Sequence, residues 1–398
     1  MAQNNTSKLL FTISTTLFLC YSCGQNKNIK RNMGIYVTKD TMSQIGTIHL
    51  ELDSVTSSYL SCIQYVTTND SVDGGKLIYF NEETGSLYFN DISSRRIIKK
   101  ISPAVPAQLL KKKFQGFYYY NKDSIFLFSY SPKVLLINDT GQILKTYKID
   151  IPFGDMSQNI TCKGMDIQTK HMPYVFKNKL YISSLVVGNL AKREIRKNQI
   201  ILDLQTGQVE IGLPHFPDEY HNNYGGLQYY FFYTTVNTGT EQIIYSFPAS
   251  DSMTIYSLSS NKIFHKFSTS KYISNIDYYD ESKFENAPSG GAGEYFMQNP
   301  SYGAVLYDKY RNVYYRMALL PVDIKNANYE AKGAPAKQIS VVILDKDFNY
   351  LGEQLLEKNK YWPNTAFVSK DGLNIQNKAS ADSTLDFSIF LVQKKSNL

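Results

Sequence analysis

A short pattern recurs along this chain of 398 residues and constrains its fold more than any other feature. Each copy has an apolar strand, a polar residue at its end, a tight turn and a second strand. Clear copies are SLYFNDISSRRIIKKI from Ser86, KVLLINDTGQILKTYKI from Lys133 and QIILDLQTGQVEIGLP from Gln199. An Asn, Asp or Ser at the strand's end can hydrogen-bond the backbone of its own turn, and Gly141 and Gly207 can supply positive φ there. Recurrence of one such unit predicts a repeat architecture.

Weaker copies begin at Met253 and Ser340, which makes five in all. The polar residues before the turns are 48, 65, 54 and 88 residues apart, at Asn90, Asn138, Asp203, Ser257 and Asp345. Further strand candidates precede several copies, at 116–121, 124–130, 174–178, 179–186, 227–236 and 241–247. Four strands in roughly 50 to 65 residues is the plan of a β-propeller blade, in which each twisted sheet packs on its neighbours.

The number of units predicts six blades, with seven as the alternative. A sixth set of strands runs from Thr365 to Val392, and the chain then ends. An early strand from Thr47 to Leu52 could complete this set and leave the ring without a free edge. We therefore expect an all-β, six-bladed propeller closed by its N- and C-terminal strands.

Aromatic composition supports the all-β class. The chain has 32 Tyr and 22 Phe against one Trp, and they come in runs such as 117–120 and 229–233. Aromatic side chains favour pleated, half-buried surfaces, and these runs lie between clusters of Asn, Asp, Gly and Ser. No segment after the N-terminus shows a sustained helical period.

The N-terminus has the order of a bacterial lipoprotein signal. Lys8 is followed by a largely apolar stretch from Leu9 to Leu19, too short to cross a bilayer, and then by Ser22 and Cys23. We expect residues 1–22 to be a signal peptide, Cys23 to carry acyl chains that hold the protein at a membrane, residues 23–34 to be a tether and residues 35–398 to be the propeller. Modification at Cys20 and plain secretion are the alternatives.

Charge and cysteine content exclude few classes of function. The formal net charge is +7 with scattered basic residues, and no cluster resembles a phosphate-tracking stripe, so nucleic acid is not expected as a partner. Lys99-Lys100 and Lys111–Lys113 are interpreted as solvated hairpin ends, or as a source of attraction to an anionic membrane surface or polymer. Cys62 and Cys162 are expected to be buried, and the sequence leaves a disulfide between them open.

The chain combines the lipoprotein start and the tyrosine-rich units with the segment GEYF from Gly293, followed by NPSYGAVLYDKYRNVYYR from Asn299. In these features it resembles an uncharacterised family of Bacteroidetes lipoproteins with a six-bladed, TolB-like β-propeller. The resemblance implies a fold, a lineage and a cell-envelope location, but no activity and no site residues. Surface-exported lipoproteins of that lineage carry acidic residues just after the modified Cys. Residues 24–28 have none, which favours the periplasmic face of the outer membrane.

The densest candidate ligand site lies between Tyr302 and Arg316, where charged residues alternate with tyrosines. Arginine forks and tyrosine rings together could hold an anionic or sugar-like ligand. The candidate residues are Tyr302, Asp308, Arg311, Tyr315 and Arg316. The alternative is an Asp–Arg pair that stabilises a blade hairpin.

Two other regions are weaker candidates. Residues 215–221 (HFPDEYH) concentrate two histidines and two carboxylates, but their spacing matches no zinc motif, so we expect a solvated loop and no metal. Insertions at 287–293 and 322–337 are expected to be loops, the first a flexible connection, near one end of the central channel, where propellers generally bind ligands.

Catalytic motifs are absent from the sequence: it has no GxSxG, HExxH or P-loop, and no cofactor is expected. Two functional hypotheses follow. The first is a non-catalytic module that binds a glycan, a peptide or an envelope protein. The alternative is a polysaccharide hydrolase or lyase of the envelope, which would need carboxylates brought together in the channel from different blades.

Overall fold

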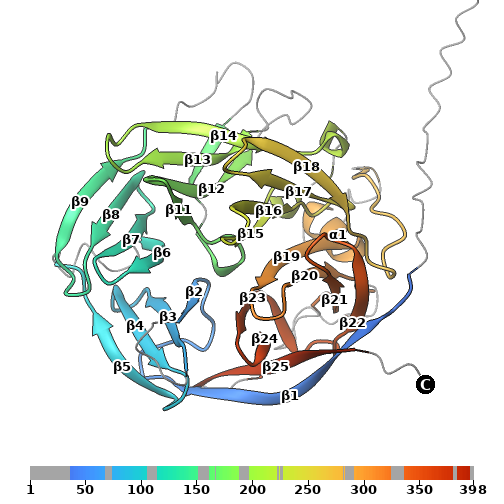
Figure 1. Ribbon diagram of the computed structural model, residues 1–398, viewed down its shortest axis with the longest axis horizontal. Coiled ribbons are helices and arrows are strands. Elements are labelled where there is room, and N and C mark those ends of the chain that lie inside the picture. Colours follow the sequence, from blue (N-terminus) through green and yellow to red (C-terminus); the bar gives the residue numbers. More distant parts are fainter. Residues whose placement is uncertain are drawn as a thin grey trace, which may run out of the picture. The chain divides into compact units, whose positions relative to one another are not determined.

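The computed structural model describes residues 36–67, 74–104, 114–150, 161–165, 167–187, 197–221, 224, 227–280, 282, 291–323, 336–379 and 383–394. Within these ranges the strands form six antiparallel sheets around one axis (Figure 1). The all-β class and the prediction of six blades are therefore confirmed, and the alternative of seven blades is not found.

Each of the first three blades is one sheet. Blade 1 contains β2 (Ile63–Val66), β3 (Lys76–Asn81), β4 (Ser86–Asp91) and β5 (Arg96–Ile101). Blade 2 contains β6 (Phe114–Asn121), β7 (Ser124–Ser129), β8 (Lys133–Ile137) and β9 (Ile143–Lys148). Blade 3 contains β10 (Thr161–Met165), β11 (Tyr174–Phe176), β12 (Lys179–Val187), β13 (Lys197–Asp203) and β14 (Val209–His215).

The last three blades follow the same plan. Blade 4 contains β15 (Tyr233–Asn237), β16 (Gln242–Ser246), β17 (Ser252–Ser257) and β18 (Lys262–Phe267). Blade 5 contains β19 (Ser301–Asp308), β20 (Val313–Leu319), β21 (Ile339–Leu344) and β22 (Tyr350–Leu355). Blade 6 contains β23 (Tyr361–Ser369), β24 (Gly372–Asn377), β25 (Thr384–Lys394) and the outermost strand β1 (Asp40–Glu51).

Blade 6 closes the ring, because its fourth strand comes from the other end of the propeller sequence. β1 pairs antiparallel with β25 from Asp40↔Lys394 to Glu51↔Thr384, with one irregularity between Gln44 and Gly46. The predicted strand at 47–52 therefore belongs to a longer one. Eleven paired positions make this the seam that keeps the ring shut.

The polar residue before each turn does what the sequence predicts in four of the five copies. Oδ1 of Asn138 accepts bonds from the backbone N–H of Thr140 and Gln142, and Asp203 and Asp345 accept comparable pairs. Ser257 accepts a longer one from Ser260. Gly141 and Gly207 have φ of +83° and +80°. In the first copy the accepting side chain is Asp91, because Asn90 turns inward and donates to Glu51.

Tyrosines also build a second layer of core outside the sheets. The connections around blade 4 contain the 3-10 helices η5 (Asp218–His221) and η6 (Leu227–Tyr229) and the helix α1 (Gly291–Gln298). Tyr220, Tyr229 and Tyr295 are buried there in one aromatic cluster, with their hydroxyls bonded to backbone groups. The strand predicted from Leu227 thus starts only at Tyr233, and a short helix begins at the end of the predicted 287–293 loop.

Candidate functional site

Asp308 holds together the hairpin between β19 and β20. Its side chain is fully buried and accepts bonds from Arg311 Nη1 at 2.9 Å, from the Tyr315 hydroxyl at 2.9 Å and from two backbone N–H groups of the turn. Arg311 Nη2 also donates to the carbonyl of Lys370 in blade 6, at 2.7 Å. This is the hairpin-stabilising arrangement that the sequence offered as the alternative to a ligand site.

Arg316 lies in a different environment, between blades 4 and 5. Its side chain is fully buried, and its guanidinium donates to Ser246 Oγ, to Ser268 and to the carbonyls of Ser250 and Asp251. The Tyr302 ring covers the guanidinium at 3.7 Å. The structure therefore divides the five predicted residues between two buried networks. Ligand contact by them stays a prediction, and the geometry favours the structural alternative.

The central channel contains a cavity of about 320 Å³. Its walls come from β6, β11, β15, β19 and β23, the inner strands of five blades (Figure 1). The polar lining consists of Tyr118, Tyr120, Thr169, Lys170, Tyr174, Thr234, Thr235, Thr238 and Asn364. Among the described residues that line the cavity, Lys170 is the one charged side chain and none is Asp or Glu.

A 3-10 helix, η3 (Thr169–His171), places Lys170 in this channel. Thr169 ties η3 to blade 1: its backbone N–H donates to the carbonyl of Ser61 at 3.1 Å, and its Oγ1 accepts from the backbone N–H of Ile63 at 2.9 Å. Lys170 Nζ lies 5.0 and 5.3 Å from the ring centres of Phe231 and Tyr233. Cation–π contact and the tie to blade 1 together hold the ammonium at the channel wall.

A second cavity, of about 620 Å³, lies between blades 1 and 2. Tyr120 lines both this cavity and the channel cavity, so the two cavities are neighbours that share a lining residue. Lys76, Lys99 and Lys122 line the second cavity, and Asp139, the one carboxylate among its described lining residues, is paired with Lys99 at 2.8 Å. No sequence pattern indicates either cavity. The aromatic run 117–120 predicted only a strand, and no sequence motif indicates a functional role for Lys170.

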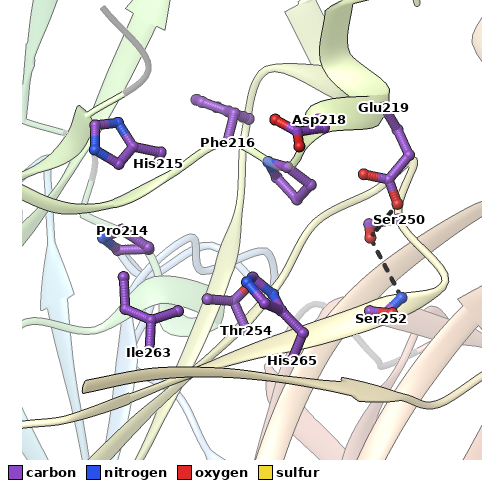
Figure 2. Close-up of a pocket in the computed structure, with 11 residues that line it drawn as sticks. Pro214, His215, Phe216, Asp218, Glu219, Ser250, Ser252, Thr254, Ile263 and His265 are labelled. Atoms are coloured by element: carbon purple, nitrogen blue, oxygen red, sulfur yellow. Dashed lines mark hydrogen bonds between the residues drawn. The ribbon is translucent and has the colours of Figure 1, made fainter. Parts of the chain in front are cut away.

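The histidine-rich region 215–221 faces a third cavity, of about 280 Å³, between blades 3 and 4 (Figure 2). His215, Asp218 and Glu219 line one wall, and His265 of β18 lines the other, where its Nδ1 is 3.2 Å from Thr254 Oγ1. Glu219 accepts a bond from Ser250 at 3.2 Å. In the part of the chain that the structure describes, no three His, Cys, Asp or Glu side chains are grouped to hold a metal ion.

Other predicted features are only partly visible. Cys62 is buried as a free thiol, with its Sγ 3.7 Å from the carbonyl oxygen of Phe117. Cys23, Lys111–Lys113 and the side chain of Cys162 lie outside the described residues. The same is true of residues 1–35, so the predicted signal, tether and start of the propeller stay predictions. In the described ranges, no helix has the length and apolar character needed to cross a membrane.

Comparison with known proteins identifies the family. The sequence profile of a domain of unknown function, DUF4221, matches residues 40–355. The chain belongs to the DUF4221 family. The family and fold that the sequence resemblance implied are therefore confirmed. None of the curated proteins matches the chain.

Two solved structures show the same fold. A DUF4221 member from Bacteroides vulgatus superposes with a TM-score of 0.74 at 22% identity, covering 90% of this chain and 99% of that one. A protein from Bacteroides fragilis named "Putative exported protein" superposes with a TM-score of 0.51 at 13% identity, covering 89% and 96%. At these identities the likeness to the DUF4221 propeller concerns the fold alone.

Proposed function

We propose that this protein is a lipid-anchored component of the bacterial cell envelope, on the periplasmic face of the outer membrane, whose propeller binds a ligand in its central channel. The lipoprotein-type N-terminus ending at Cys23 supports the proposed location in the cell envelope. The structurally similar protein from Bacteroides fragilis, whose name describes it as exported, also supports this location. The expected partners are the membrane, through the anchor, and an envelope glycan, peptide or protein, and not nucleic acid.

The lining of the channel cavity carries this proposal. Inner strands of five blades and η3 contribute tyrosine rings, threonine hydroxyls, the Asn364 amide and the Lys170 ammonium. Pockets of this kind, largely apolar with a few polar groups, are typical ligand sites. Glycoside hydrolysis generally uses two carboxyl groups about 5 to 10 Å apart. Because the described lining has no carboxylate, binding is favoured over polysaccharide cleavage.

A binding screen on the soluble domain from Gln25 onward tests the proposal. Glycans, peptides and small envelope metabolites are added, and turnover is followed in the same samples. Tyr120→Ala removes a ring that lines the cavity and is 51% exposed, so the fold is expected to tolerate it. Tyr130→Ala, at a ring that is 63% exposed and outside the cavity, is the matched control.

Binding that Tyr120→Ala weakens and Tyr130→Ala leaves unchanged is the expected result. Turnover of a polysaccharide would instead favour the hydrolase or lyase. Binding that neither variant affects would place the site outside the channel and contradict the proposal.

A further inference from the structure

The channel cavity and the neighbouring blade 1–2 cavity together offer more room than a single sugar or amino acid needs. Their volumes, about 320 and 620 Å³, each fall in the range of roughly 300 to 1,000 Å³ that holds a small-molecule ligand. Tyr120 belongs to both, and its ring centre is 6.4 Å from that of Tyr118 in the channel wall. We call the two cavities together the Tyr120 groove.

The described residues that line the Tyr120 groove carry a net positive charge. Lys170 lies in the channel part, and Lys76, Lys99 and Lys122 line the other part. Lys99 is neutralised by Asp139, the one carboxylate among the described lining residues. Ammonium groups separated along a groove suit a chain that bears several separate carboxylates, because each can form a charge-assisted hydrogen bond.

The uncharged side chains that line the Tyr120 groove favour one class of anionic ligand over another. Tyr120 presents a half-exposed ring, and a sugar ring can lie flat on such a surface through its C–H face. The hydroxyls of Thr234 and Thr238 and the amide of Asn364 can each donate and accept, which matches the hydroxyl groups of a sugar. An acidic peptide could pair with the lysines and with these groups, but its acidic side chains offer no ring to lie on Tyr120.

We infer that the Tyr120 groove binds an acidic oligosaccharide, with sugar rings against Tyr120 and carboxylates at Lys76 and Lys122. The inference rests on the proposed function and names the class of ligand for the same site. It goes beyond that function in extending the site from the channel to blades 1 and 2.

Fluorescently labelled oligomers of galacturonic, glucuronic and sialic acid, titrated with the soluble domain and followed by anisotropy, test the inference. Each is compared with the same oligomer after its carboxyl groups are reduced to alcohols, and with oligoglutamate of equal charge. Lys76→Gln combined with Lys122→Gln removes two groove charges. Lys133→Gln combined with Lys262→Gln removes two charges from exposed lysines outside both cavities.

We expect at least one acidic oligomer to bind, and its reduced form and the groove variant to bind about tenfold more weakly, with the control unchanged. Equal binding of the acidic and reduced forms, lost in Tyr120→Ala, would overturn the inference while leaving the proposed function intact. Equal binding of oligoglutamate would show recognition of charge alone and would also overturn it. If no acidic oligomer binds, the inference is wrong, and the broader screen decides the proposed function separately.

Discussion

The Arg316 guanidinium lies 3.7 Å from the centre of the Tyr302 ring, and the Tyr302 hydroxyl donates to Asp251 at 3.0 Å. Arg316 belongs to β20 of blade 5, whereas its acceptors belong to blade 4 and the turns next to it. One side chain thus joins two blades through charge-assisted hydrogen bonds in a dry environment. Sequence alone suggested a ligand contact at this residue.

Replacing Arg316 with leucine is expected to destabilise the domain by about 3 to 5 kcal/mol, because several buried acceptors lose their donor. Urea unfolding, followed by tyrosine fluorescence, measures the loss. Arg96→Leu, at a side chain 73% exposed, is expected to change stability by less than about 1 kcal/mol. If Arg316→Leu kept its stability but lost ligand binding, Arg316 would be assigned to ligand binding instead.

Strand geometry explains why the five residues from Tyr302 to Arg316 do not form one site. Successive side chains of a strand point to opposite faces, so Tyr315 reaches Asp308 in its own blade while Arg316 reaches blade 4. The hairpin contact between Asp308 and Arg311 was predictable, because it is local. The opposite faces of Tyr315 and Arg316 also follow from the sequence. Tyr302 and Asp308 are six positions apart, and they lie on opposite faces only because of the strand irregularity between Tyr302 and Val305.

The fold was largely predictable because its signals are local and repeat. The polar residue before each turn, the positive φ at Gly141 and the closing strand near the N-terminus each follow from a few neighbouring residues. The channel differs, since its lining comes from five blades and from η3. Lys170 has no sequence neighbour that marks it, and only the closed ring brings it near Tyr120 and Asn364 in one cavity.

Lys337 predicts a pH dependence of stability. Its Nζ is buried over the Phe296 ring and donates to the carbonyl of Asn299 and to Ser301 Oγ. Burial lowers the pKa of Lys337 well below its ordinary value of 10.5. Between the lowered pKa and 10.5 the unfolded chain binds more protons than the folded one, so the free energy of unfolding rises with pH in that window.

Comparison of wild type with Lys337→Met isolates this contribution. The free energy of unfolding of wild type, relative to the variant, is expected to rise between pH 7 and 9.5, by at most about 1.4 kcal/mol per pH unit. Urea titrations at fixed pH values provide the measurement. Lys370→Met, at an exposed lysine, serves as control. A difference between wild type and Lys337→Met that stays constant over this range would contradict the burial argument.

The Cys62 thiol is expected to be unreactive in the folded protein. Burial raises the pKa of Cys62 to about 12, and only the thiolate attacks disulfide reagents. In a soluble domain carrying Cys162→Ser, an aromatic disulfide reagent should therefore label Cys62 only after unfolding in guanidinium. Labelling under native conditions, at the rate seen in guanidinium, would show that the segment around Cys62 opens readily or that the thiol is exposed.

Cys23 is expected to determine whether the protein is held at a membrane. Acyl chains on its thiol would contribute about 0.8 kcal/mol for each buried CH2 group, so two or more chains anchor stably. In the full chain expressed in its bacterial host, Cys23→Ser is expected to abolish acylation and to move the protein from the membrane to the soluble fraction. Mass spectrometry of the mature N-terminus and fractionation measure both effects. Cys20→Ser is the matched variant: it should leave acylation at Cys23 intact, and loss of the lipid in Cys20→Ser alone would assign the modification to Cys20 instead.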